Sequence, residues 1–269
     1  MMSEINKASA PKSENNGVYH LRLKKGDVPK AVLLPGAPER TSIIAENWDN
    51  VEDLGQYREY KTVRGTYQGM PIAATSTGIG GASSEICINE LHKVGVDTCI
   101  RIGSTGCIQP NIDLGDLIIP YAYVKRDGTS DCYVDPSFPA VANIRVVMAL
   151  IEACERLGYK YHLGVGYTVG SFYIGQARHI NEDGSGYWPS FADKLIPDLQ
   201  SAGITNIEME AAGQYVVGML HGMRMGAVLS VISNRVLDRW GDNGGEEKSC
   251  KAACEALKIL DEWRKNGIF

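Results

Sequence analysis

The sequence predicts an α/β fold, in a single domain with a mainly parallel or mixed sheet. Short apolar segments with strand character alternate with amphipathic helical segments along the chain, which is the pattern of α/β proteins. No linker-like break and no internal repeat interrupts this alternation, and 269 residues suffice for one large domain with a substantial core. We therefore expect one domain over residues 18–269 and a polar, disordered tail over residues 1–17.

The first half of the chain predicts five strands and two helices. An apolar run that begins at Ala31 closes in a Pro-Gly turn, and later runs alternate apolar and polar residues or end in glycine-rich loops. The expected strands cover residues 31–34, 57–67, 71–77, 98–102 and 117–124. Helical spacing is expected over 39–48, and Ser83 and Ser84 are good starting residues for a second helix.

The second half predicts three helices, two strands and an insertion. Apolar residues recur at helical spacing over 145–157, where Gly158 ends the helix, and a further helix is expected over 209–223. Strands are expected over 161–172 and 225–233, and the irregular stretch 181–189 is expected to be an exposed insertion. The last helix should bury one face made of Cys250, Ala253, Cys254, Leu257, Leu260 and Trp263.

Composition excludes several classes of protein. A net charge of -5 and a pI ≈ 5.6 argue against non-specific nucleic-acid binding, which needs an excess of Lys and Arg. No apolar run approaches the ~18 residues of a membrane-spanning helix, and the polar first residues lack the apolar core of a signal peptide. We expect a cytoplasmic protein with neither a membrane nor a nucleic acid as its partner.

The seven cysteines and five histidines point away from disulfides and metals. The odd number and scattered spacing of the cysteines give no disulfide framework, and there is no CxxC pair for zinc. Cys250 and Cys254 lie four residues apart in a helical pattern, and we expect both in the core rather than on a metal. The histidines form no HxH or HxxxH pair, which disfavours a metal hydrolase.

Three glycine-rich strand ends are candidates for an anion site: PGAPER at 35–40, TGIGGASS at 77–84 and RIGSTG at 101–106. Glycine lets backbone N–H groups approach an anion, and Arg40 and Arg101 add charge suited to phosphate. An ordinary turn is the more frequent explanation of any one such cluster. GIGGAS does not match the fingerprint G-x-G-x-x-G, which disfavours a dinucleotide-dependent oxidoreductase.

A second constellation lies between residues 172 and 212. Gln176 and Arg178 stand two apart in a segment expected to be extended, so both side chains lie on one side and can recognise the imide edge of a pyrimidine. A surface loop with two solvated side chains explains this segment equally well. In IEMEAA at 207–212, a carboxylate can accept bonds from vicinal sugar hydroxyls, or a Glu can complement the dipole of a helix N-terminus.

Together these motifs resemble the nucleoside phosphorylase family, most closely its uridine-cleaving members. The motifs follow the family's order from about Val18 to Arg235: VYHLRL, PGAPER, REY, TSTGIGG, RIGSTGCIQP, FYIGQAR and IEMEAA. GQxR combined with EME is far more specific than any glycine cluster. The resemblance implies a single α/β domain around a twisted, partly barrel-like mixed sheet flanked by helices. It also implies a homo-oligomer with shared active sites, either a dimer or a trimer of dimers.

The resemblance further implies roles for individual residues. Phosphate would be bound by Gly36, Arg40, Arg101, Ser104 and, from a neighbouring subunit, Arg58. The nucleoside would be bound by Phe172, Gln176, Arg178, Glu208, Met209, Glu210, Arg235 and, from the neighbour, His20. Catalysis would depend on Arg101, Gln176, Arg178 and Glu210, and Arg235 would reach the uracil carbonyl region through water. In some members the positions of Glu59, Ile79 and Ser83 hold a potassium ion between paired subunits.

The implied reaction is reversible phosphorolysis of uridine to uracil and ribose 1-phosphate, in pyrimidine salvage, with inorganic phosphate as co-substrate and no required cofactor. Whether deoxyuridine or thymidine is also cleaved is left open. Ala37, Ile174 and Ser104 stand where the family commonly has Asp, Pro and Thr. Purine-handling members carry an Asp after a Ser, but Asn234 follows Ser233 here, which favours pyrimidines. The alternatives are a purine nucleoside phosphorylase or nucleosidase of the same fold, and a non-enzymatic nucleoside-binding protein.

Overall fold

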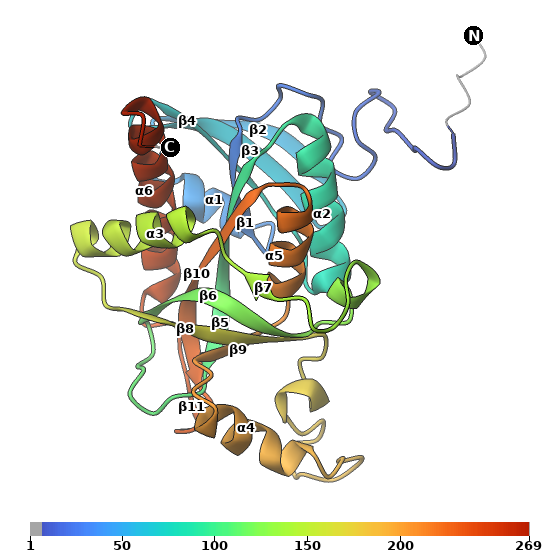
Figure 1. Cartoon of the computed structure of the whole chain (residues 1–269), viewed down its shortest axis with the longest axis vertical. Helices are drawn as coiled ribbons and strands as arrows, with labels where there is room; N and C mark the ends of the chain where they lie inside the picture. The colour runs from blue at the N-terminus through green and yellow to red at the C-terminus, as the bar shows by residue number, and fades with distance from the viewer. Residues whose placement is uncertain (1–6, 269) are drawn as a thin grey trace.

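The computed structural model describes residues 7–268, which fold around one mixed sheet of eleven strands (Figure 1). Along the sheet the order is β11-β10-β6-β8-β9-β5-β1-β4-β3-β2, and β7 pairs with β6. The strands are β1 (Ala31–Pro35), β2 (Asn50–Tyr57), β3 (Tyr60–Tyr67), β4 (Met70–Thr75), β5 (Thr98–Cys107), β6 (Leu117–Arg126), β7 (Ala140–Val141), β8 (Tyr161–Val169), β9 (Asn206–Glu208), β10 (Arg224–Asn234) and β11 (Arg239–Trp240).

The middle of the sheet closes into a barrel of five strands. β10 pairs in parallel with β5 and antiparallel with β6. β6 and β8 pair in parallel, as do β8 and β9, and β9 returns antiparallel to β5. From β5 the strands β1, β4, β3 and β2 extend as an open sheet. The predicted α/β fold with a mixed, partly barrel-like sheet is confirmed.

Helices cover the sheet on both sides (Figure 1). α2 and α5 lie side by side on one face, α3 and α6 pack together on the other, and α4 lies beyond the end of the barrel. The helices are α1 (Arg40–Ala45), α2 (Gly81–Val94), α3 (Ile144–Leu157), α4 (Ala192–Ser201), α5 (Ala211–Leu220), α6 (Gly245–Lys265) and the short 3-10 helices η1 (Ser130–Cys132) and η2 (Ile174–Gln176). Within residues 7–268, no helix combines the length and the apolar character needed to cross a membrane.

The strands between these helices are buried on both faces. In β1, Leu33 packs into the core that includes residues of α3 and α6, while Val32 and Leu34 pack into the core that includes residues of α2 and α5. This alternation follows from the period of two in a strand, and burial of both faces explains why such strands are almost entirely apolar. Cys250 and Cys254 of α6 are buried in the core, as predicted.

Several element boundaries differ from the prediction. β5 continues to Cys107, because its pairing with β10 runs through the Gly-Ser-Thr-Gly stretch that we expected to be a loop. β4 ends at Thr75 and β8 ends at Val169, both earlier than expected. α1 ends at Ala45, and α5 begins only at Ala211. α2 begins at Gly81 after Gly80, which has φ of 89°, so Ser83 and Ser84 do not cap it.

Two of the longer elements, β2 and α4, were not predicted because each lacks the usual signal. β2 is an edge strand whose side chains are mostly exposed, so no apolar alternation marks it. α4 contains Pro197, a residue that normally argues against a helix interior. Residues 181–187 are exposed, as expected for the insertion. Of the tail, residues 1–6 lie outside the described part, while Lys12 pairs with Val18 in an isolated bridge, before the predicted boundary.

Candidate active site

A cavity of about 670 Å³ opens at the carboxyl ends of strands β1, β5, β9 and β10. Ligands of α/β proteins bind at such strand ends, and small-molecule sites typically have volumes of about 300–1,000 Å³. Both halves of the chain contribute to its wall. The predicted site residues that line it are Gly36, Arg40, Glu59, Ile79, Arg101, Ser104, Phe172, Gln176, Arg178, Glu208, Met209 and Glu210.

One part of the wall, which we call the arginine cluster, consists of Gly36, Arg40, Arg101 and Ser104. The loop after β1 is fixed against the segment after β4, because the backbone N–H of Gly78 donates to the carbonyl of Gly36 at 3.0 Å. Arg40 begins α1; its Nη2 donates to Ser104 Oγ at 3.0 Å, and its Nε pairs with Glu246 of α6. Three separate elements therefore fix the Arg40 guanidinium at the cavity.

Arg101 is a deeply buried arginine on β5, with 3% of its surface exposed. Its Nη2 lies 2.5 Å from Glu210 and 3.0 Å from Glu208, and both carboxylates are buried as well. Burial alone would lower the pKa of Arg101, but the carboxylates of Glu210 and Glu208 outweigh it and raise the pKa. Nε and Nη1 have no hydrogen-bond partner among the described residues, which costs about 1–3 kcal/mol per buried group. Such open, charged donors fit an oxyanion.

Gly103 gives this guanidinium its space. The prediction of a glycine loop that offers N–H groups to an anion is wrong at this position, because Gly103 pairs with Leu229 inside the barrel. A Cβ on Gly103 would lie 2.9 Å from Nη2 of Arg101. Arg101 and Gly103 are two apart on one face of β5, so any larger residue would displace the charged group.

The two carboxylates beside Arg101 are held by backbone N–H groups at helix starts. Glu208 accepts from the backbone N–H of Ala211 at 2.9 Å and from Thr168 Oγ1 at 2.5 Å. Glu210 accepts from the N–H of Gly80 at 2.6 Å, which joins the start of α2 to the cavity. Burial raises the pKa of Glu208. Glu208 thus fits the alternative of a Glu at a helix N-terminus, while it also lines the cavity.

A second part of the wall, which we call the aromatic cluster, consists of Phe172, Gln176, Arg178 and Trp240. The prediction of an extended segment for Gln176 and Arg178 is wrong. The segment forms one 3-10 turn, after which Ala177 has φ of 50°. Both side chains line the cavity even so. The Arg178 guanidinium carbon lies 4.6 Å from the ring centre of Phe172 and 5.7 Å from that of Trp240. Burial lowers the pKa of Arg178.

Arg235 supports the aromatic cluster from behind. Its Nη1 donates to the carbonyl of Gln176 at 2.8 Å and its Nη2 to that of Ala177 at 3.1 Å. Burial, together with repulsion by Arg178, lowers the pKa of Arg235 to about 10. The geometry gives Arg235 a positioning role, because it fixes the backbone on which Gln176 stands. Its predicted water-mediated contact to the base stays a prediction.

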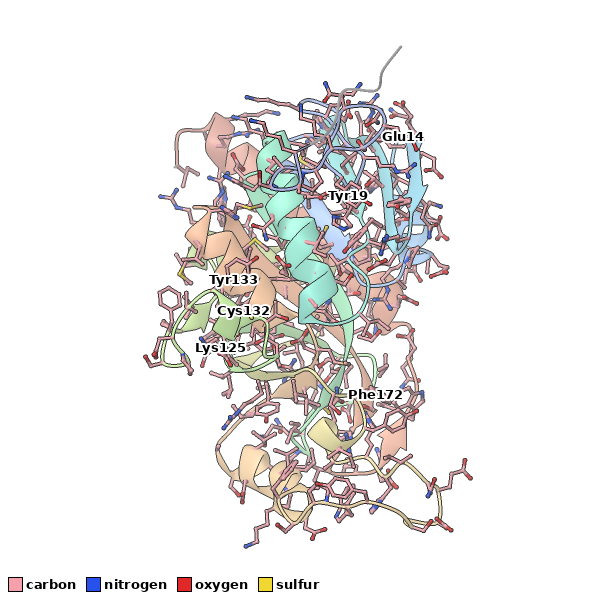
Figure 2. The ribbon with its side chains drawn as sticks, turned by 90° about the vertical axis from the view of Figure 1, so that its right-hand side faces the viewer. Glu14, Tyr19, Lys125, Cys132, Tyr133 and Phe172 are labelled. Carbon is pink, nitrogen blue, oxygen red and sulfur yellow. The ribbon has the colours of Figure 1, made fainter. Side chains whose placement is uncertain are left out.

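Among the predicted residues, His20 and Arg58 do not line this cavity, nor do Arg235 and Ser83. His20 Nδ1 lies 2.9 Å from Glu90, and Arg58 is exposed, with its guanidinium carbon 5.6 Å from the ring centre of Tyr57. Figure 2 shows Tyr19, the neighbour of His20, in the upper part of the molecule and Phe172 in the lower part. His20 therefore lies away from the aromatic cluster of its own chain. That His20 and Arg58 contribute to the active site of a neighbouring subunit stays a prediction.

Glu59, Ile79 and Ser83, the residues predicted to hold potassium, belong to one edge of the cavity. Ser83 Oγ donates to a carboxylate oxygen of Glu59 at 2.7 Å, and this bond lowers the pKa of Glu59. Glu59 and Ile79 line the cavity, and Ile79 is 76% exposed. Carboxylate, hydroxyl and carbonyl oxygens are donors that suit a hard cation.

Among the residues at the site that the sequence did not predict as site residues are Trp240, Ser233 and Glu246. Trp240 lines the cavity from β11, in a polar stretch without strand periodicity. Ser233 also lines it, and its buried Oγ has no partner within residues 7–268. Glu246 pairs with Arg40, which is 206 residues away in sequence. The one signal in the sequence that could have indicated Trp240 was its closeness to the predicted site residue Arg235.

Comparisons with known proteins agree with the geometry. A family model described as the phosphorylase superfamily matches residues 30–262, which include every residue that lines the cavity. The uridine phosphorylase of Thermococcus kodakarensis is 48% identical over 264 residues, 98% of this chain and 94% of that protein. That of Escherichia coli K12 is 39% identical over 220 residues, 81% and 86% of the two chains. A guanosine phosphorylase of Halorubrum lacusprofundi is 34% identical over 217 residues, 81% and 83% of the two chains.

Proposed function

The chain belongs to the phosphorylase superfamily, and from this premise we propose that it is a pentosyltransferase that cleaves uridine. Phosphate bonds to C1′ of the ribose as the bond from C1′ to the uracil nitrogen breaks, giving uracil and ribose 1-phosphate. The similarity to uridine phosphorylases supports this reaction. The observation that carries the proposal is that Arg101 lines the same cavity as the aromatic cluster and has two buried donors without a partner among the described residues.

In this proposal the arginine cluster binds phosphate. Arg40 and Arg101 present planar guanidinium groups that suit an oxyanion, and Nε and Nη1 of Arg101 are free of other partners in the described chain. Breaking the glycosidic bond builds positive charge on the sugar. A bound phosphate stabilises that charge and supplies the attacking oxygen, so no covalent enzyme intermediate is needed. Charge-assisted hydrogen bonds of this kind contribute about 1.5–3 kcal/mol each.

Gln176 and Arg178 of the aromatic cluster would bind the base, with Phe172 packing near it, and Glu210 would bind the sugar. The Gln176 amide both donates and accepts, which matches the imide edge of uracil, and the side chain is only 3% exposed. The departing uracil gains negative charge on its carbonyl oxygens, which Arg178 stabilises. Glu210 has a carboxylate that accepts from the vicinal hydroxyls of ribose. Donors placed where charge develops lower the barrier most.

We propose a pyrimidine as the preferred base because of how Asn234 is used. Purine-handling members of the family carry an acid at this position. The Asn234 Nδ2 donates to the carbonyls of Gln109 and Ile112, and its Oδ1 accepts from the N–H groups of Val236 and Leu237. The amide therefore fixes the end of β10 and offers no proton to a purine ring. The similarity to a guanosine phosphorylase makes the purine alternative the one to test.

The decisive experiment is a substrate panel with and without phosphate. Uridine, thymidine, inosine and guanosine are incubated with the enzyme, and release of free base is followed by absorbance. We expect fast release of uracil that requires phosphate, and much slower release from the purine nucleosides. Release without phosphate would indicate a nucleosidase, and a preference for inosine or guanosine would indicate a purine phosphorylase. Binding of uridine without any release would indicate a nucleoside-binding protein.

We further propose that the site is completed by a second copy of the chain. Arg58 and His20 lie outside the cavity of their own chain, and Arg58 is exposed. Ile79, a large apolar side chain at the cavity edge, is 76% exposed and so is available for contact with another subunit. In a dimer with two-fold symmetry, Arg58 of each chain would reach the phosphate in the cavity of the other.

Mixing two inactive variants tests this arrangement. Arg58→Ala and Arg101→Ala are each expected to be inactive alone. Random mixed dimers would regain about a quarter of wild-type activity, because half of the dimers are mixed and one of their two sites is intact. No recovery after co-expression, with mixed dimers shown by mass spectrometry, would contradict the shared site.

We also propose that the Glu59 carboxylate, the Ser83 hydroxyl and the Ile79 carbonyl hold a potassium ion between paired subunits. The lowered pKa of Glu59 supports this, since it keeps the carboxylate ionised. Thermal unfolding is compared in potassium and sodium buffers of equal ionic strength. A higher midpoint in potassium is expected for the wild type and not for Glu59→Gln. Equal midpoints for the wild type in the two salts would contradict a potassium site.

A further inference from the structure

Trp240 has no part in the proposed reaction as described so far, although it lines the cavity. Its side chain is large and apolar, yet 64% of its surface is exposed. An aromatic side chain can bury roughly 150–250 Å² and often dominates the energetics of binding. An aromatic side chain that is exposed at a cavity wall therefore indicates a surface that a ligand covers. We propose that Trp240 is a nucleobase-contacting residue, whose indole packs against the uracil ring. This inference rests on the proposed function, since it takes a nucleoside as the occupant.

The backbone holds the indole at the cavity. β11 is only two residues long, but Trp240 pairs with Ser233 in the antiparallel ladder to β10, and Gly241 N–H donates to the carbonyl of Ile232 at 2.9 Å. Ser233 and Ile232 line the same cavity. The turn between the two strands is closed by the Asn234 side chain, which accepts from backbone N–H groups within it. The position of Trp240 is therefore set by the barrel strand β10.

The neighbours of Trp240 suit a flat, polar ring. The Arg178 guanidinium lies within cation–π distance of both Phe172 and Trp240, at 4.6 Å and 5.7 Å from their ring centres. Two aromatic rings and a planar cation thus belong to one wall. A nucleobase has a π-face that stacks on aromatic side chains, and such stacking contributes about 1–3 kcal/mol per base. A pyrimidine nucleoside would cover the indole and contact Arg178 at the same time.

Trp188 provides a matched contrast. It lies in the exposed insertion, where it stacks on His179 with ring centres 3.8 Å apart and an interplanar angle of 17°. Its Nε1 donates to Asp193 at 2.8 Å. Trp188 does not belong to the cavity wall. Its ring is already covered by His179, just before the insertion, whereas the Trp240 ring is exposed at the cavity.

The first test is a titration with uracil, followed by tryptophan emission, on the wild type, Trp240→Phe and Trp188→Phe. We expect uracil to change the emission of the wild type and of Trp188→Phe to the same extent, and to leave Trp240→Phe nearly unchanged. An undiminished change in Trp240→Phe would overturn the inference. Because uracil is the probe, this test does not depend on turnover.

The second test is kinetic. Loss of stacking in Trp240→Ala should lower kcat/KM for uridine by about tenfold to a hundredfold, with the KM for phosphate changed by less than about twofold. Trp240→Phe keeps a ring and should stay within about threefold of the wild type. A kcat/KM for Trp240→Ala equal to that of the wild type would overturn the inference.

Sedimentation of Trp240→Ala separates contact with the base from contact with a second copy of the chain. The assembly size should equal that of the wild type, and a loss of activity that follows dissociation would overturn the inference. If the wild type itself released no uracil in phosphate, the proposed function would fail. The uracil titration would still decide the role of Trp240.

Discussion

The arginine cluster and the aromatic cluster line one cavity but are built in opposite ways. Arg101 stands on β5, which is paired on both sides by β1 and β10, and is 3% exposed. Phe172 and Trp240 stand on a loop and on the two-residue strand β11, and are 41% and 64% exposed. Arg101 thus belongs to the barrel, whereas Phe172 belongs to the connection between β8 and β9 and Trp240 to the segment after β10.

This difference separates two tasks. A buried guanidinium must keep its position without water, because any displacement leaves charges unpaired at low dielectric, so a strand inside the barrel suits it. Groups that select a base need not be rigid to the same degree, and loops on a rigid scaffold usually carry specificity. We therefore expect substitutions in the arginine cluster to change stability and phosphate use together. Substitutions in the aromatic cluster should change the use of the nucleoside alone.

Arg101→Ala should have the largest effect. It removes the positive partner of Glu208 and Glu210, and breaking a buried ion pair costs about 3–5 kcal/mol of stability. Loss of the phosphate contact should also lower kcat/KM at least about a hundredfold. Thermal unfolding and steady-state kinetics with varied phosphate measure the two effects. Turnover close to that of the wild type would contradict the assigned role.

A second variant separates the two effects of Arg101→Ala. Adding Glu208→Gln, which leaves the ribose-binding Glu210 in place, removes one of the unpaired negative charges and should restore part of the lost stability, while activity stays low. If activity returned together with stability, Arg101 would act only as a structural partner of the two carboxylates.

Gln176→Ala should show the opposite pattern in the aromatic cluster. The amide is buried, and its loss leaves uracil groups without partners, so kcat/KM for uridine should fall by about ten- to hundredfold. Phosphate binding, measured by calorimetry, should equal that of the wild type. Weaker phosphate binding in this variant would show that the two clusters do not act separately.

Gly103→Ala tests the arginine cluster without removing any functional group. The added Cβ would lie 2.9 Å from Arg101 Nη2, so the guanidinium has to move. We expect the KM for phosphate to rise by about tenfold, because the displaced guanidinium binds phosphate more weakly. An unchanged KM in Gly103→Ala would indicate that Arg101 needs no such space.

Much of the barrel was predictable because its strands are buried on both faces and therefore appear as apolar runs. β2 was not, since its exposed side chains follow no apolar alternation. The length of β5 was hidden by its glycines, which normally end strands; here Gly103 makes room for Arg101 and Gly106 makes room for Ser233. The local sequence pattern thus gave the wrong end of this strand, because the size of a residue in β5 is limited by side chains that pack against it in the folded protein.

The site shows the same division. The arginines and carboxylates could be predicted from motifs, because each motif is a short stretch of sequence that carries its own chemistry. The contacts that hold them could not, since Glu246 reaches Arg40 and Thr168 reaches Glu208 only after folding. Trp240 is a further example: its place in the cavity follows from its pairing with Ser233, which no local sequence pattern indicates.

Arg235→Lys should have the smallest effect, and it is the most sensitive test of whether the two clusters act separately. Arg235 donates to two backbone carbonyls, of Gln176 and Ala177, and a lysine ammonium cannot reproduce that planar fork. One hydrogen bond lost to a backbone carbonyl contributes about 1 kcal/mol, which predicts a rise of about three- to fivefold in the KM for uridine. The KM for phosphate and the unfolding temperature should stay near wild-type values, because β5 and Arg101 are untouched. A rise in the KM for phosphate of the same size would mean that the connections after β8 and β10 also position the arginine cluster. In that case the division between barrel and connections would not hold.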